Sequence, residues 1–185
     1  MASLMGDDGS PTPAAPLDPE QIGRLLEASA QAVTVELEAL GAAARWRPAL
    51  GEWSANEALG HILEAERRAF NGRIRTILAE DGPVLRLFDE AGVAAERHDE
   101  LRATDGLLAE FLAIRADSLD LVRSLRPADL LRAGVHPVVG ELSVGAIVGA
   151  WVHHDRNHLK QILSVSQARV WAQTGVARRF VDPTA

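Results

Sequence analysis

Four long stretches of the chain carry apolar residues at the three-to-four-residue spacing of an amphipathic helix, and this pattern constrains the fold most strongly. They run from Asp18 to Leu40, from Ser54 to about residue 80, from about 100 to 125, and from Ser143 to about Trp171. No convincing alternation of polar and apolar residues predicts a strand. The predicted fold class is all-α, and a four-helix bundle is the simplest architecture that buries four such stripes.

Two helix starts are marked by capping signals. Asp18 is a suitable N-cap before Pro19, and "SANE" at 54–57 has the spacing of a capping box between Ser54 and Glu57. The links between the helices are all long enough to cross the bundle. The periodicity therefore leaves the up-down order of the helices open.

The domain organisation is predicted from composition. Residues 1–17 are rich in Gly, Pro, Ser and Asp, and we expect a flexible N-terminal tail. Residues 18–185 contain no internal repeat and no second domain, so they are expected to form a single four-helix-bundle domain.

Charge and cysteine content exclude several kinds of site. The 26 acidic and 19 basic residues give a formal charge of −7, which argues against a nucleic-acid partner. The chain has no cysteine, so it has no disulfide, no cysteine-ligated zinc and no thiol nucleophile of its own. The opening segment lacks the pattern of a signal peptide, and no apolar run approaches the ~18 residues of a membrane span. We expect a cytoplasmic protein without a membrane partner.

The segment "WVHHDRNHLKQI", from Trp151 to Ile162, holds three of the six histidines. On a helical wheel His158 falls inside the apolar stripe, His154 lies at its edge, and His153 points away. Two histidines four residues apart on one helix face can share a metal ion. The same spacing also arises by chance, so the pattern alone leaves both interpretations open.

Three other residues could complete such a site. His61 lies at the margin of the second stripe, where it is either a third ligand or a half-exposed polar residue. Asp155 falls near the centre of its stripe and could orient an imidazole, pair with an arginine such as Arg156, or bond to another helix. His136, in a link rich in Gly and Pro, could carry a proton near the metal or merely pack in the link.

Two segments together resemble the DinB-like superfamily of metal-binding proteins. They are "GEWSANEALGHILEAE" at 51–66 and "GVHPVVGELSVGAIVGAWVHHDRNHLKQI" at 134–162. The family pattern is a Trp-Ser capping box followed by a histidine, and a later HxxxH followed by Gln. Here those positions are Trp53, Ser54, Glu57, His61, His154, His158 and Gln161.

The resemblance implies a four-helix bundle of up-down-down-up order, with a divalent metal, zinc or nickel, held by His61, His154 and His158. It also implies a homodimer. Some relatives transfer or isomerise groups with a low-molecular-weight thiol such as mycothiol, bacillithiol or glutathione. Three imidazoles leave a divalent metal with open positions, as in catalytic sites.

The sequence therefore favours a metal-dependent enzyme that transfers an external thiol to a small electrophile, or activates water, with Asp155 and His136 in supporting catalytic roles. The alternative is a non-catalytic bundle that binds a metal or a small ligand. A helical dimer whose histidines hold no metal is the third possibility.

Overall fold

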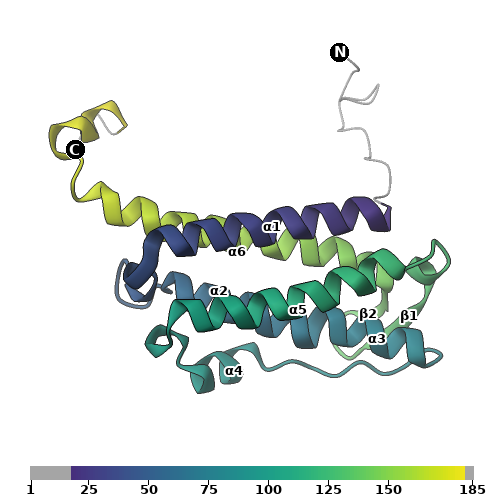
Figure 1. Ribbon diagram of the computed structural model, residues 1–185. Helices are drawn as coiled ribbons and strands as arrows, with labels where there is room; N and C mark the ends of the chain where they lie inside the picture. The colour runs from purple at the N-terminus through teal and green to yellow at the C-terminus, as the bar shows by residue number, and fades with distance from the viewer. Residues whose placement is uncertain (1–17, 182–185) are drawn as a thin grey trace, which may run out of the picture.

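The computed structural model describes residues 18–181, so the expected tail at 1–17 lies outside the described residues. Figure 1 shows the long helical segments packed side by side. They are α1 (Pro19–Leu40), α2 (Ala55–Glu64) continued by α3 (Gly72–Ala79), α5 (Thr104–Ser124) and α6 (Val144–Trp171). The all-α four-helix bundle expected from periodicity is confirmed.

The helices follow the up-down-down-up order that the resemblance implies. In Figure 1, α1 and α6 run in one direction, and α2–α3 and α5 run in the other. Two consecutive parallel segments require a connection that returns along the bundle. Residues 80–103 provide it, and they include a short helix that the sequence analysis did not predict, α4 (Glu90–Arg97).

The second predicted helix is interrupted by a π-helical segment, Ala65–Asn71, between α2 and α3. A π-helical turn holds one more residue than an α-helical turn, so it rotates the following side chains relative to the preceding ones. Glu66 lies in this segment and is fully buried, against Arg115 of α5. Apolar spacing did not reveal the interruption, because the stripe continues on both sides of it.

A small antiparallel hairpin was also not predicted. Strand β1 (Ala133–His136) pairs with β2 (Gly140–Ser143), which leads directly into α6. Each strand has four residues, which is too short for alternation to stand out. An isolated bridge between Val84 and Val135 ties the hairpin to the connection that follows α3.

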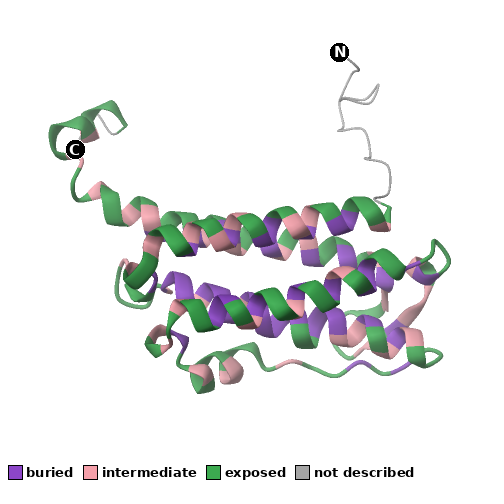
Figure 2. Ribbon diagram, in the orientation of Figure 1, coloured by how far each residue is buried: buried purple, intermediate pink, exposed green. Residues whose placement is uncertain are grey.

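The core lies along the inner faces of the long helices, as Figure 2 shows. One apolar cluster surrounds Phe111, and a second surrounds Trp151. The Arg115 guanidinium lies 4.9 Å from the Phe111 ring centroid and 5.9 Å from that of Trp151, so a buried charge lies where the two clusters meet. In residues 18–181 no helix is both long and apolar enough to cross a bilayer.

Candidate metal centre

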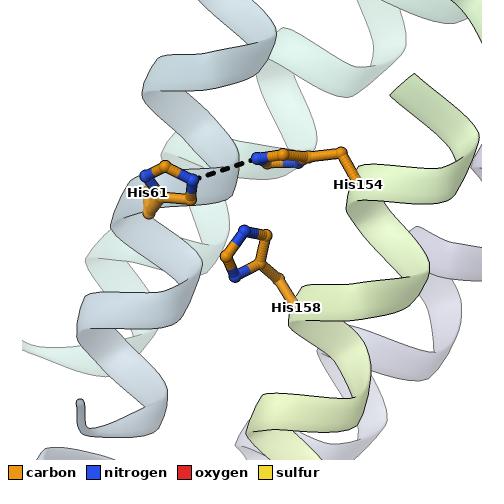
Figure 3. A group of neighbouring side chains, drawn as sticks. All are labelled: His61, His154 and His158. Carbon is orange, nitrogen blue, oxygen red and sulfur yellow. Dashed lines mark hydrogen bonds between the residues drawn. The ribbon is translucent and has the colours of Figure 1, made fainter. Parts of the chain in front are cut away.

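Two helices bring three histidines together. His61 projects from α2, and His154 and His158 project from successive turns of α6, so the three rings face one another (Figure 3). One potential ligand atom from each lies within 4.8 Å of the other two. The α2 start is held by the capping box: Ser54 Oγ accepts from the Glu57 amide at 3.3 Å, and Glu57 accepts from the Ser54 amide at 2.9 Å.

The ring nitrogens have the spacing of metal ligands. His61 Nε2 and His154 Nε2 are 3.0 Å apart. Ligand nitrogens of a tetrahedral zinc, with Zn–N of about 2.0–2.1 Å, stand roughly 3.3 Å apart. The three imidazoles therefore fit a divalent metal that prefers nitrogen ligands, once the rings move so that every pair of ligand atoms, now within 4.8 Å, reaches this separation.

The site keeps these imidazoles neutral. Burial lowers the pKa of His61 to about 4, with a further contribution from His158. Burial also lowers the pKa of His154 to about 3, with contributions from His158 and His61. Burial lowers the pKa of His158, opposed by its bond to Gln161 and by the charge of Glu90. Neutral imidazole is the form that binds a metal, so the site is ready for one at neutral pH.

The outer ring nitrogens of His158 and His154 differ in their hydrogen bonding. His158 Nδ1 lies 2.9 Å from Gln161 Oε1, an acceptor that places the proton on Nδ1 and leaves Nε2 free. His154 Nδ1 is buried and has no hydrogen-bond partner among the described residues. Hence Gln161 supports one ligand, and His154 lacks a comparable partner.

Aromatic rings enclose the histidines on two sides. The Trp53 ring centroid lies 5.2 Å from that of His61 and 6.2 Å from that of His158. Phe70 packs edge-on against His154 at 5.2 Å. These rings cover part of the half-buried ligands and limit their rotation.

A cavity beside His61 opens between α2 and α4, and four acidic residues line it. Glu57 pairs with Arg47, Glu64 with Arg67, Arg68 and Arg97, and Asp99 with Arg97 and Arg102. Glu90 is the exception, because within residues 18–181 it forms no ion pair and no side-chain hydrogen bond. Its charge nevertheless favours protonated His158, so its carboxylate is close to the site.

The cavity wall depends on Gly60, next to His61. A Cβ at this position would lie 1.7 Å from Asp99 Oδ2, so only glycine permits Asp99 to pack against α2. Asp99 is buried and accepts from Arg97 Nε at 2.7 Å. The ion-pair network thereby holds the end of α4 against the cavity.

Asp155 contacts an arginine, whereas the sequence analysis expected it to orient an imidazole. Its Oδ2 lies 2.8 Å from Arg115 Nη2, and no hydrogen bond joins it to a histidine in the described part of the chain. Burial raises the pKa of Asp155 to about 6, against the lowering effect of Arg115. Of the alternatives left open, contact with another helix is the one observed, since Arg115 belongs to α5.

His136 does not join the three histidines either. Its Nδ1 lies 3.3 Å from the Val138 amide and 3.4 Å from the Val139 amide, within the turn of its own hairpin. The hairpin lies at one end of the bundle in Figure 1. The alternative that His136 packs in the link agrees with these contacts. His153 is exposed beside Asn157, as the helical wheel predicted.

The roles of Glu90 and Arg115 were not predicted from the sequence. Glu90 lies in a segment without a strong periodic pattern, and nothing local relates it to His61. Arg115 falls within the apolar stripe of its helix, between Phe111 and Ser118 on the buried side. A charged residue at a buried helical position was the one signal that could have identified it.

The sequence is similar to a protein family and to individual proteins of known sequence. A family model described as the DinB superfamily matches residues 25–162. The chain is 27% identical over 121 residues to a protein of Oceanobacillus iheyensis named "Putative metal-dependent hydrolase", an alignment that covers 65% of this chain and 69% of that protein. A protein of Bacillus mycoides with the same designation is 25% identical over 122 residues, covering 66% and 69%.

One solved structure is similar in fold. It is YfiT from Bacillus subtilis, described as "a probable metal-dependent hydrolase with an unusual four-helix bundle topology". The TM-score is 0.74 at 18% identity, over 86% of this chain and 93% of that one. At this identity the similarity concerns the arrangement of the helices.

Proposed function

The chain belongs to the DinB superfamily, and we propose that it is a metal-dependent hydrolase whose metal is held by His61, His154 and His158. The observation that carries this proposal is the convergence of three neutral imidazoles, two of them with Nε2 atoms 3.0 Å apart, beside a cavity. The names of the relatives from Oceanobacillus iheyensis and Bacillus mycoides support hydrolysis as the reaction.

When bound, a divalent metal would polarise a water molecule or a thiol and lower its pKa toward neutrality. The chain supplies the other requirements. Gln161 orients His158, and Trp53 and Phe70 enclose the ligands. Among residues 18–181, Glu90 is the one acidic side chain of the cavity without an ion pair, so we propose that it accepts the proton that the nucleophile loses.

The nucleophile could instead be an external thiol. The chain has no cysteine, so any thiol would arrive as a small molecule. The same site would then transfer that thiol to an electrophile. We propose zinc or nickel as the metal, because both accept imidazole ligands.

The test is a metal-reconstituted assay with neutral aryl esters and small electrophiles, each with and without mycothiol, bacillithiol or glutathione. Hydrolysis that requires metal and disappears in His158→Ala supports the proposal. Turnover only in the presence of thiol assigns the transferase alternative. Metal binding without turnover across the panel assigns the non-catalytic binding module.

Glu90→Gln is tested in the same assay, with metal content measured alongside. We expect unchanged metal content and a loss of turnover of about 10²–10⁴-fold, the usual contribution of a general base. Loss of metal would instead make Glu90 a ligand. The matched control is Asp105→Asn, which changes an exposed acidic residue in the first turn of α5. It should leave metal content and turnover unchanged.

A further inference from the structure

A second concave surface lies beside the histidine cavity, between α3 and the connection to α4. Three arginines, Arg68, Arg73 and Arg86, line it together with the apolar side chains of Leu87, Phe88 and Val93, and we call it the arginine groove. Phe88 and Val93 also line the cavity that contains His61. The two concave surfaces are therefore neighbours with a shared wall.

Arg73 is the distinctive residue of this groove. Among residues 18–181, no carboxylate oxygen lies within 4.0 Å of its guanidinium, although the chain as a whole is acidic. Its Nε is buried and has no hydrogen-bond partner in the described part of the protein. Within residues 18–181 its guanidinium makes one hydrogen bond, a long one from Nη2 to the Arg86 carbonyl at 3.4 Å.

The unpartnered Nε makes this arrangement unfavourable, and the other donors of the half-buried guanidinium are available to a ligand. A buried donor without a partner costs about 1–3 kcal/mol, and more when it is charged. Burial lowers the pKa of Arg73, while the charge of Glu90 raises it. The guanidinium offers a planar set of donors that matches the two oxygens of a carboxylate or a phosphoryl group.

The other charges around the groove leave Arg73 available. Arg68 Nε donates to Glu64 at 2.6 Å, so it is already paired. Asp89 accepts from the Gly92 amide as the N-cap of α4. Glu80 and Arg86 are exposed, and neither forms an ion pair in residues 18–181.

We propose that the arginine groove binds the anionic group, carboxylate or phosphoryl, of a small amphiphilic molecule. Arg73 and Arg86 contact the anion, and Leu87, Phe88 and Val93 contact its apolar body. This body extends toward the three histidines across the shared wall. That the molecule is the substrate rests on the proposed function, whereas its binding does not.

The experiment measures ligand binding to the metal-free, full-length protein by titration calorimetry. The probes are benzoate, phenylphosphonate and the neutral analogue benzamide. We expect saturable binding of an anion and at least tenfold weaker binding of benzamide, because charge-assisted hydrogen bonds supply much of the affinity. The tighter of the two anions identifies the preferred group.

Arg73→Gln should raise the Kd of the anion about tenfold or more. Arg75→Gln is the matched control: it removes the same charge from the same helix, but its side chain pairs with Asp117 outside the groove. Its Kd should stay within about twofold of the wild-type value. Arg86→Gln is a second groove variant that tests the proposal if Arg73→Gln unfolds, and it should weaken the anion as well.

Absence of saturable anion binding, equal binding of benzamide, or an equal loss in Arg75→Gln would overturn the proposal. Hydrolysis of a neutral ester by the zinc-loaded protein is measured separately, because it tests the proposed function. Arg73-dependent anion binding without any hydrolysis would support the groove and reject the hydrolase. Hydrolysis without anion binding would support the hydrolase and reject the groove.

Discussion

His158 Nδ1 lies 2.9 Å from Gln161 Oε1, three residues further along α6, and this contact determines which ring nitrogen faces the other two histidines. Because the amide oxygen can only accept, the proton is on Nδ1 and the lone pair is on Nε2. A partner of this kind raises the basicity of a metal-bound imidazole and limits its rotation.

Gln161→Leu should therefore weaken metal binding about 10–100-fold, the usual effect of removing such a partner. Affinity is measured by competition with a chromophoric chelator. Asn157→Leu is the control, since it removes an amide from the same helix that contacts His153 instead. Equal losses in the two variants would show that the orientation of His158 is not set by Gln161.

Metal retention distinguishes adjacent histidines. His154→Ala should abolish retention of a divalent metal after gel filtration, because it removes one of three ligands. His153→Ala should retain about one metal per chain, as measured by elemental analysis, since His153 is exposed on the opposite side. Equal metal content in both variants would contradict the assigned site.

The buried ion cluster should dominate the stability of the core. Arg115, Glu66 and Asp155 are each at most 2% exposed, and among residues 18–181 Arg115 is the one side chain that forms an ion pair with either carboxylate. Arg115→Met should lower the free energy of unfolding by roughly 3–5 kcal/mol, the usual cost of leaving buried charge unpaired. Urea denaturation followed by circular dichroism measures this loss.

The control is Arg123→Met, which removes a partly exposed pair with Glu27 and should cost at most about 1 kcal/mol. A loss in Arg115→Met no larger than in this control would mean that the two carboxylates find other partners.

Acid should destabilise the metal-free protein through the histidines. His61 and His154 have pKa values of about 4 and 3 in the folded protein, below the ordinary 6.5. The unfolded chain therefore binds more protons below pH 6.5, and stability falls as the pH drops from there toward 4. The raised pKa of Asp155, about 6, works in the opposite direction between about pH 6 and 4.

The double variant His61→Gln/His154→Gln isolates the histidine contribution, because Asp155 is common to both proteins. Between pH 7 and 5 the wild type should lose more stability than the variant, on the order of 2 kcal/mol per histidine. Parallel pH profiles would show that the folded pKa values are ordinary.

We also predict a homodimer, as the resemblance implied. Val35, Leu112 and Leu163 are 65%, 43% and 45% exposed, and they line neighbouring hollows along α1. Val35→Glu should shift the protein toward monomer in sedimentation at micromolar concentration, because a charge cannot be buried unpaired at such a face. Val138→Glu in the hairpin turn is the control, and a monomeric wild type would refute the prediction.

Several features of the protein follow from its sequence alone, because they depend on residues within a few positions of one another. Apolar spacing predicts the long helices, and "SANE" predicts the α2 start through a capping box that the structure contains. Spacing also predicts that His154 and His158 share a face of α6 and that His153 does not. These contacts act over one or two helical turns, so the local pattern determines them.

Only the tertiary structure decided what those faces meet. The sequence allowed Asp155 to orient an imidazole, but in the structure it pairs with Arg115, forty positions away in the chain. Arg115 also pairs with Glu66, which lies in the π-helical segment. His61 became a neighbour of His154 because α2 packs against α6. The surroundings of Glu90 and Arg73 depend on the path of the connection after α3, which runs back along the bundle. Such partners come from distant segments, and the periodicity of one helix carries no information about which side chain lies opposite.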